Sequence, residues 1–379
     1  MRFIEETWSS EKLGNLCKIT MGQSPSSKNY SKNSNDTILI QGNADLISGK
    51  IVPRIYTSEI TKLSYPGDII LTVRAPVGDL AINEFDSCIG RGVCSIKGNK
   101  FIYYYLESLK DKHVWERLSQ GSTFESVNSN DIKNLNLKIP SNSTQNHIIN
   151  FFTAIDTKIE LLQKKHGEYI RFKQYLMQNI FADKSAEKLR FNFTDEWEKY
   201  LLGDISLIGK GFTPSTSNPS FWDGDLKWLS IADMNQGKYI NQTTKKITSD
   251  GSKNKEPVKK GTLLMSFKLS IGKLGILTED MYTNEAICNF KWKNKDVLTE
   301  YMYYYLSSIN ILKYGSQAAK GITLNNETLS TIPVLLPSLE EQKKIINILS
   351  DVDMKINMLE NSINDTSKFK KGLLQQMFV

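Results

Sequence analysis

The chain has 379 residues, of which 40% are hydrophobic and 23% charged, and its formal net charge is +7 at pH 7. This length exceeds what one hydrophobic core normally serves, so we expect two or more domains. No stretch approaches the roughly 20 apolar residues of a membrane-spanning helix, and the start MRFIEETWSS lacks the apolar segment of a signal peptide, so we expect neither.

The cysteines indicate the cellular compartment, whereas the net charge does not identify a ligand. Cys17, Cys88, Cys94 and Cys288 show no CxxC spacing, and a chain of this size does not need disulfides, so we expect a cytoplasmic location. The positive charge is compatible with nucleic acid, but many basic proteins bind nothing acidic.

Residues 1–140 predict a mixed α/β domain, which we call the first head. The segment is rich in Gly, Pro, Ser, Asn and Thr, and its run DIILTVR (68–74) is typical of a buried strand between turns. The stretch FIYYYLESLK (101–110) predicts a helix. Three consecutive tyrosines on a helix point in three directions, so we expect them to pack the core rather than to stack on bases.

Residues 141–182 predict one long helix. Apolar side chains recur every three or four residues from Ile148 to Ile180, which is the seam of a coiled coil sustained for more than about four heptads. A helix of some 40 residues is about 60 Å long, too long to be covered by a domain of ordinary size. It therefore needs a partner helix.

The rest of the chain repeats this order. A linker at 182–196 leads into a second head, residues 183–337, and residues 338–379 predict a second long helix. The opening of the first head recurs residue by residue in the second: Trp8, Leu13, Gly14, Ile19, Gly22, Pro25 and Ser26 correspond to Trp197, Leu202, Gly203, Ile208, Gly211, Pro214 and Ser215. Further on, GDIILTVRAPVGDLAI (67–82) matches GTLLMSFKLSIGKLGI (261–276), and Cys94 matches Cys288.

Both long helices begin with the same motif. PSNSTQNHIINFF (140–152) and PSLEEQKKIINIL (337–349) share a proline, a serine and a glutamine five residues past the proline. Ser338 with Glu341 predicts a capping box at the second entrance, while Ser141 and Thr144 give a weaker version at the first. The acidic stretch DVD (351–353) predicts a solvated face.

These elements predict an α+β fold: two similar mixed α/β globular domains separated by an antiparallel coiled coil of two long helices, with approximate two-fold symmetry. The polar seam residues His166, Lys173 and Lys370 either fix the helix register or extend their polar ends to solvent. A protein with two similar, non-identical heads suits duplex DNA, whose backbone is itself two-fold, and each head would read a different half-site.

Together, these motifs resemble those of a known family. The head openings LGNLCKITMGQSPSS and LGDISLIGKGFTPST, the stretch WLSIADM (228–234), the strand GDIILTVRAPVG and the helix entrance PSLEEQKKI are similar to the DNA specificity subunit of type I restriction-modification systems. The resemblance covers essentially the full chain, with the two heads as target recognition domains and the two long helices as repeated helical regions.

The resemblance implies a subunit without catalytic activity of its own. It would recognise a bipartite target in double-stranded DNA and recruit two adenine methyltransferase subunits, through which restriction subunits join. The chain itself would hold no cofactor, whereas S-adenosylmethionine, ATP and magnesium would be used by the partner subunits.

We predict DNA contacts in exposed loops, because loops carry recognition while regular elements carry the fold. In the first head the candidates are Gln23, Ser24, Ser26, Ser27, Lys28, Asn43, Arg54, Arg74, Arg91, Ser122 and Thr123. In the second head they are Thr213, Ser215, Thr216, Asn235, Lys268, Ser270, Lys320 and Thr323. Arg can donate two hydrogen bonds to guanine, Asn or Gln can pair with adenine, and Ser, Thr and Lys can bind phosphates.

Structural roles compete with each of these assignments. Serines and threonines beside Pro25 or Pro214 are also ordinary turn residues. Arg74 and Lys268 follow matching buried strands, where a DNA contact competes with an ion pair. Gly14 and Gly203 more readily serve backbone turns than a ligand.

The sequence lacks the common enzyme motifs, which favours a role in binding. The segment GDISLIGKG (203–211) has five residues between Gly203 and Gly209, where a phosphate loop has four, and no Ser or Thr after the lysine. His113, His147 and His166 lack zinc-site spacing, and no dinucleotide-binding or aminomethyltransferase motif occurs. The alternative to a DNA specificity subunit is a coiled-coil scaffold or adaptor whose heads bind protein.

Overall fold

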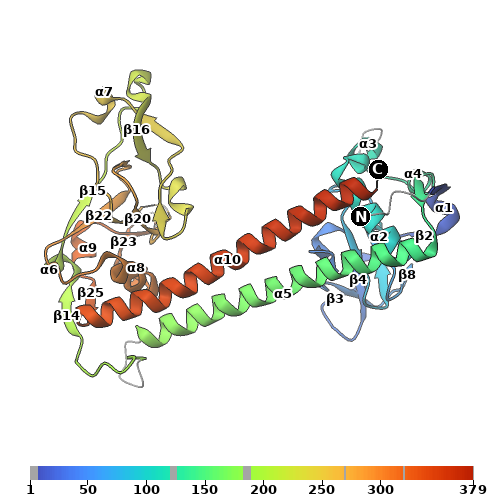
Figure 1. Ribbon diagram of the computed structural model, residues 1–379, viewed down its shortest axis with the longest axis horizontal. Coiled ribbons are helices and arrows are strands. Elements are labelled where there is room, and N and C mark those ends of the chain that lie inside the picture. Colours follow the sequence, from blue (N-terminus) through green and yellow to red (C-terminus); the bar gives the residue numbers. More distant parts are fainter. Residues whose placement is uncertain (1–6, 120–125, 182–188, 269, 319–320, 379) are drawn as a thin grey trace. The chain divides into compact units, whose positions relative to one another are not determined.

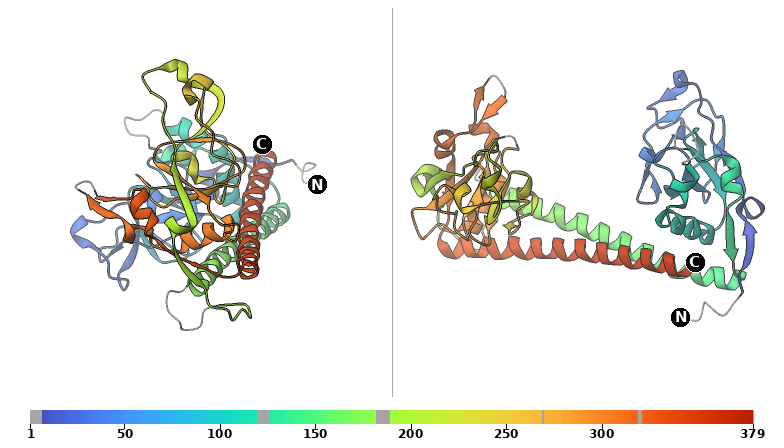
Figure 2. Two further views of the ribbon diagram at one scale, coloured as in Figure 1. Left: turned by 90° about the vertical axis from the view of Figure 1, so that its left-hand side faces the viewer. Right: turned by 90° about the horizontal axis from the view of Figure 1, so that it is seen from above.

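The computed structural model describes residues 7–119, 126–181, 189–268, 270–318 and 321–378. The chain divides into two compact units, residues 1–165 with 359–379 and residues 166–358. Helices α5 (Asn142–Ile180) and α10 (Leu339–Met377), each of 39 residues and uninterrupted, contribute to both units (Figures 1 and 2). The head limits at 140 and 337 remain predictions, because the division falls within the long helices.

The first unit contains two sheets and a two-stranded ribbon. The six-stranded sheet has the order β2 (Lys18–Met21), β12 (Val93–Lys97), β9 (Ile69–Thr72), β10 (Leu80–Ile82), β6 (Lys50–Ile51) and β5 (Leu46–Ile47). The five-stranded sheet has the order β3 (Tyr30–Ser31), β7 (Tyr56–Thr57), β4 (Thr37–Ile40), β11 (Ser87–Ile89) and β8 (Leu63–Ser64). The ribbon pairs β1 (Ser9–Lys12) with β13 (Asn136–Ile139). Its short helices are α1 (Leu13–Leu16), α2 (Lys100–Asp111), α3 (Val114–Ser119), α4 (Ser129–Lys133), η1 (Ser27–Asn29) and η2 (Asn43–Asp45).

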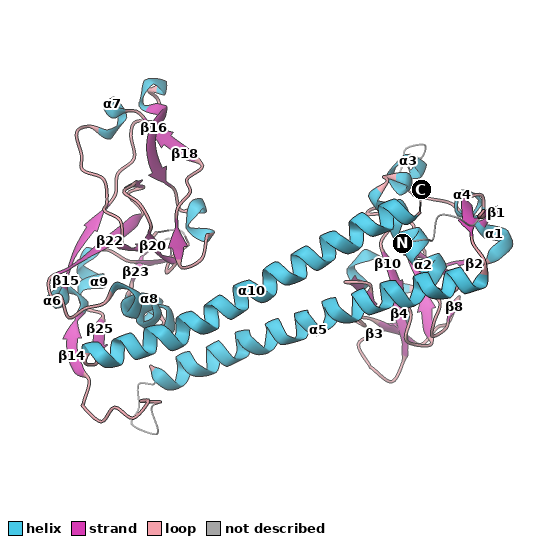
Figure 3. Ribbon diagram, viewed as in Figure 1, coloured by secondary structure: helices cyan, strands magenta, loops and turns pink. Residues whose placement is uncertain are grey.

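The second unit repeats the central sheet. Its five-stranded sheet has the order β15 (Ser206–Lys210), β22 (Ile287–Trp292), β19 (Leu263–Ser266), β20 (Leu274–Leu277) and β17 (Tyr239–Ile240), as in the first unit from β2 to β6. The other strand groups are β18 (Lys245–Ile247), β16 (Trp222–Leu229) and β21 (Tyr282–Thr283), then β14 (Glu198–Leu201) with β25 (Pro333–Leu336), and β23 (Ser316–Ala318) with β24 (Gly321–Thr323). Its short helices are α6 (Leu202–Ile205), α7 (Ser249–Ser252), α8 (Thr299–Ser308), α9 (Asn326–Ser330), η3 (Pro219–Phe221), η4 (Ala232–Asn235) and η5 (Ile311–Tyr314) (Figure 3).

The predicted buried runs form the centres of these sheets. Every residue of β9 and of β19 is buried, because each strand lies between two neighbours in its sheet and its alternating apolar side chains enter two different hydrophobic clusters. The tyrosines of α2 and α8 pack the core as predicted: Tyr104 and Tyr304 are 2% and 0% exposed. Among the described residues, no helix is both long and apolar enough to cross a bilayer.

The repeated glutamine explains why both long helices begin with the same motif. Gln145 is buried, and its amide donates to the carbonyl of Pro140 (3.1 Å) while its oxygen accepts from Asn99 (2.9 Å) at the start of α2. Gln342 makes the same bond to Pro337 (3.0 Å). Each glutamine therefore ties its helix to the proline that precedes it. Both also reach the neighbouring helix, because the Gln342 oxygen accepts from the N–H of Leu298 (3.0 Å), just before α8.

The capping box at Ser338 forms only in part. The Ser338 hydroxyl accepts from the N–H of Glu341 (3.3 Å), as predicted. The Glu341 carboxylate, 1% exposed, does not return to Ser338 but binds Arg190 (2.7 Å) and the indole N–H of Trp197 (3.0 Å). A buried carboxylate requires strong donors, and a guanidinium with an indole provides them.

Ion pairs between the two long helices establish their antiparallel packing. Asp156 of α5 pairs with Lys370 of α10 (2.8 Å), and Lys173 of α5 pairs with Asp353 of α10 (2.6 Å). The partner number on α10 falls as the number on α5 rises, so the helices run in opposite directions. Both lysines are therefore ion-paired rather than extended into solvent. The prediction of a solvated face at 351–353 is wrong for Asp353, which also accepts from Tyr304 (2.7 Å).

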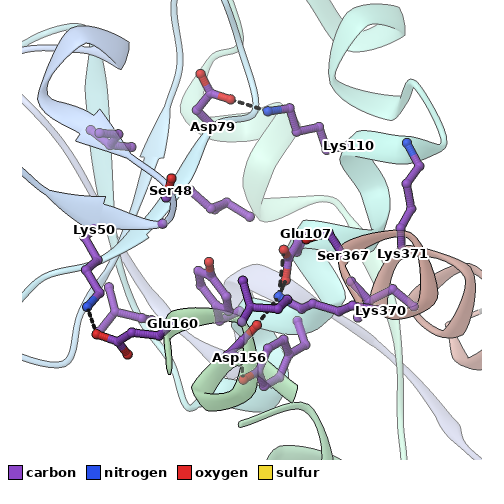
Figure 4. Close-up of a pocket in the computed structure, with 18 of the residues that line it drawn as sticks. Ser48, Lys50, Asp79, Glu107, Lys110, Asp156, Glu160, Ser367, Lys370 and Lys371 are labelled. Carbon is purple, nitrogen blue, oxygen red and sulfur yellow. Dashed lines mark hydrogen bonds and ion pairs between the residues drawn. The ribbon is translucent and has the colours of Figure 1, made fainter. Parts of the chain in front are cut away.

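The ion pairs around Lys370 lie where α10 meets the first head. Figure 4 shows Lys370 between Glu107 of α2 (2.8 Å) and Asp156 of α5, close to the separate pair Lys50–Glu160 (2.5 Å). Three helices are thus held together by one buried ammonium group.

A phenylalanine at the end of each long helix completes the core of a head. Phe378, just after α10, lies in the first unit with ring centroids 4.9 Å from Tyr105 and 6.3 Å from Trp8. Phe181, just after α5, lies in the second unit, 6.3 Å from Trp197. The head openings therefore repeat a tryptophan because each receives the end of a long helix.

Candidate nucleic-acid interface

In the first head, three loop segments meet beyond the ends of β2, β9 and β11. We call residues 22–24, 73–74 and 90–92 the first junction. Backbone hydrogen bonds join them to one another and to the neighbouring strands: Gly22 N–H to Val93 O (3.0 Å), Gln23 N–H to Ile89 O (2.9 Å), Val73 N–H to Gly92 O (2.9 Å) and Gly90 N–H to Ile40 O (2.8 Å).

The second head contains the same arrangement. We call residues 211–213, 267–268 and 284–286 the second junction. The corresponding bonds are Gly211 N–H to Ile287 O (3.1 Å), Phe212 N–H to Thr283 O (2.8 Å), Phe267 N–H to Ala286 O (3.0 Å) and Asn284 N–H to Leu229 O (2.9 Å). The backbone of this region is therefore repeated bond for bond.

A repeated glycine permits this close approach. A Cβ on Gly22 would lie 2.1 Å from the carbonyl oxygen of Gly90, and one on Gly211 would lie 2.0 Å from that of Thr283. Both distances are far inside van der Waals contact, so any side chain there would push the loops apart.

The first junction gathers four of the predicted contact residues, namely Gln23, Ser24, Arg74 and Arg91. The Ser24 hydroxyl accepts from the backbone N–H of Arg91 (3.1 Å), which fixes the loop rather than the guanidinium. The side chains of Arg74 and Arg91 are exposed and form no hydrogen bond or ion pair with any described residue. Two unpaired guanidiniums thus sit on one rigid backbone frame, suited to guanine or phosphate.

The second junction presents different chemistry. Thr213 donates its hydroxyl to the Glu285 carboxylate and accepts from the Asn284 amide (3.0 Å). Lys268 is exposed, with its ammonium 5.7 Å from the centre of the Phe267 ring. Glu285 was missed by sequence reasoning, although the register that matches Cys94 with Cys288 also matches Arg91 with Glu285.

Other predicted residues of the first head lie outside the first junction, namely Ser26, Ser27, Lys28, Asn43 and Arg54. The Ser26 N–H donates to Glu59 (2.9 Å), and the amide of Asn43 donates to Asp79. Arg54 pairs with Asp45 (2.9 Å), which is 3% exposed, so part of its guanidinium serves the fold.

Other predicted residues of the second head are also dispersed. Ser215 and Thr216 are exposed in the loop before η3, and Asn235 accepts from Lys273 (2.8 Å). The carbonyl of Ser270 accepts from the Ser266 hydroxyl, and Thr323 lies in β24. The predicted contacts Ser122, Thr123 and Lys320 lie outside the residues that the structure describes.

Two lysines that the sequence did not single out stand over aromatic rings beside the second junction. Lys245 of β18 lies 5.4 Å from the Trp222 ring, and Lys255 lies 4.4 Å from the Phe212 ring. The indole N–H of Trp228 donates to the Phe212 carbonyl (2.9 Å), which fixes this part of the loop. Such cation–π contacts orient the two exposed ammonium groups without neutralising them.

The surroundings of possible metal ligands and of two buried cysteines can be described directly. Among them, no three His, Cys, Asp or Glu side chains form a group that could hold a metal ion. Burial raises the pKa of Cys94 and of Cys288 to about 12, so both thiols stay protonated and unreactive at neutral pH.

The chain is similar in sequence to several proteins that are named as specificity subunits of type I restriction enzymes. The MjaX specificity subunit of Methanocaldococcus jannaschii, named as part of a type I restriction enzyme, is 36% identical over 195 residues, 49% of this chain and 45% of that protein. The type I restriction enzyme MjaIX specificity subunit of the same organism is 29% identical over 211 residues, 52% of this chain and 48% of the other. The alignments thus span about half the length of these two relatives. The HindI specificity subunit of Haemophilus influenzae is 24% identical over 342 residues, 70% of this chain and 73% of that one.

Solved structures show the same fold. The type I restriction-modification S subunit from M. genitalium superposes with a TM-score of 0.63 at 16% identity, over 100% of this chain and 98% of that one. A chain from a structural study of complex assembly and conformational transition of the type I R-M system gives a TM-score of 0.64 at 17% identity, over 98% and 97%. At these identities the likeness concerns the fold alone.

The family assignment follows from a match that occurs twice. The model described as type I restriction modification DNA specificity domain matches residues 5–168 and again residues 194–366, which together are most of the chain. The chain belongs to the family of type I restriction-modification DNA specificity proteins.

Proposed function

We propose that this chain is the specificity subunit of a type I restriction-modification complex and reads a bipartite DNA target, one half-site per head. The observation that carries the proposal is the pair of junctions, which share one backbone frame but expose different side chains. A shared frame suits the common backbone of duplex DNA, whereas different side chains suit different bases.

The proposal extends to the partners. The chain recruits two adenine methyltransferase subunits, and restriction subunits join through them. These partners supply the chemistry with S-adenosylmethionine, ATP and magnesium, and the chain contributes recognition. Family membership and the duplicated architecture support this assignment.

The salt dependence of DNA binding tests the proposal. Contacts to phosphates release counterions, so the logarithm of the binding constant should fall linearly with the logarithm of the salt concentration, with a slope of about −0.9 per phosphate. We expect a steep negative slope between about 50 and 200 mM salt for the full chain on duplex DNA. A flat response without duplex preference would instead indicate a protein-binding scaffold.

Methyl transfer provides a second test. The purified chain with labelled S-adenosylmethionine and DNA should transfer no methyl groups, and transfer should appear when its methyltransferase subunits are added. Robust transfer by the chain alone would contradict a purely recognising role.

A further inference from the structure

We propose that Glu285 is a specificity residue of the second head and accepts a hydrogen bond from an exocyclic base amino group, that of cytosine in preference to adenine. The inference rests on the proposed function, since it names one group with which a DNA-reading head discriminates bases. Neither the position nor its chemistry was among the contacts expected from the sequence.

Glu285 occupies the position that Arg91 occupies in the first head. Each is the second residue of a four-residue turn, which is closed by the N–H of Val93 onto the carbonyl of Gly90 (3.1 Å) or by that of Ile287 onto Asn284 (3.0 Å). Both side chains are exposed, and the four backbone bonds that define each junction are the same. The two heads therefore present opposite charges from one shared location.

The Glu285 carboxylate is held in place rather than free to rotate. The Thr213 hydroxyl donates to one carboxylate oxygen, and the Asn284 amide donates to the Thr213 hydroxyl oxygen (3.0 Å). Glu285 forms no ion pair within the described residues, so the other oxygen can accept a hydrogen bond from outside. A fixed acceptor at the exposed tip of a turn is suited to a directional contact.

Charge decides what this acceptor can contact. A carboxylate is repelled by phosphates, so on a DNA-facing turn it gains only from a donor, and the amino groups of cytosine and adenine are the donors in the major groove. A carboxylate pairs best with cytosine, whereas Arg91, which only donates, pairs with guanine. Lys268 within the second junction and Lys255 beside it are both exposed and can neutralise nearby phosphates.

Selection from a randomised duplex pool tests the inference with the full-length chain. The wild-type chain should enrich a bipartite motif with cytosine at one position of one half-site. Glu285→Gln should reduce that cytosine preference about tenfold and shift it toward adenine, because glutamine pairs with adenine. The matched variant is Arg91→Gln. It should change the preference for guanine at one position of the half-site read by the first head and leave the half-site read by the second head unchanged.

Thr213→Val provides a second variant that keeps the carboxylate and removes the hydroxyl that orients it. We expect it to weaken discrimination at the same base position as Glu285→Gln, with thermal unfolding of both variants measured alongside. If Glu285→Gln leaves the enriched motif unchanged, or lowers the affinity for all sequences equally, Glu285 is a loop-stabilising residue and the inference is wrong while the proposed function stands. If the wild-type chain enriches no motif at all, both are wrong.

Discussion

Lys370 shows how one side chain fixes the end of a long helix. The residue is 8% exposed, and its ammonium lies 2.8 Å from carboxylate oxygens of both Glu107 and Asp156. Burial lowers the pKa of Lys370, but the two carboxylates outweigh burial and the net pKa is raised. A raised pKa means that the charge stabilises the fold below the unfolded value of about 10.4 and that this contribution is lost only as the pH rises through the folded value.

Lys370→Met should therefore destabilise the first unit at neutral pH. The variant leaves two carboxylates facing each other, and because both acids are partly exposed we expect a loss of about 1–3 kcal/mol rather than the 3–5 of a fully buried pair. Urea unfolding of the full chain at pH 7 measures it. Lys368→Met on the exposed face is the control and should change stability by less than about 0.5 kcal/mol. Equal losses in the two variants would contradict this account.

At the scale of the element, each long helix depends on the phenylalanine beyond its end. Phe378→Ala removes a side chain that is 1% exposed from the first core and should cost about 3–5 kcal/mol. Phe181→Ala should act similarly on the second core. Hydrogen exchange of the two units distinguishes the effects, since each variant should loosen the unit in which its phenylalanine lies. Phe369→Ala, at a side chain 59% exposed, should be nearly neutral, and a large loss there would be unexpected.

Lys245 of β18 and Lys255 lie over aromatic rings near the second junction. Lys245→Gln and Lys255→Gln each remove an exposed charge beside this surface. If they contact phosphates, each should weaken DNA binding about equally for all sequences and reduce the salt slope by about 1. Titrations at several salt concentrations measure this. Lys259→Gln, whose lysine already pairs with Asp280 (3.0 Å), is the matched control and should leave the slope unchanged.

At the scale of the whole molecule, the two heads should be separable in function. Replacing residues 1–140 with the corresponding part of another family member should change one half-site and preserve the other, because each junction is built entirely within its own head. Methylome sequencing of cells that express the hybrid with its methyltransferase reads both half-sites at once. A change in both halves would contradict independent reading.

Sequence reasoning was accurate where the signal was periodic or repeated. It predicted both long helices, their antiparallel packing, the buried strands and the core tyrosines, because these follow from local patterns that the chain states twice. It was less accurate for charged side chains whose ion-pair partners lie far away in the sequence. The Glu341 carboxylate was assigned to its own helix entrance and instead binds Arg190, and Asp353 was assigned to solvent and instead binds Lys173.

For the candidate interface, too, some features could be predicted from the sequence and others could not. Arg74 and Arg91 could be named from the sequence as exposed cations after strands, and whether they touch DNA stays a prediction. Their convergence, and the presence of Glu285 at the position equivalent to Arg91, appear only when β2, β9 and β11 and their counterparts are paired into sheets. By itself, the sequence determined the duplication and the helical periodicity, since both are written along the chain. Only the tertiary structure decided which charges meet, because ion pairs such as Lys370 with Glu107 join residues 263 positions apart.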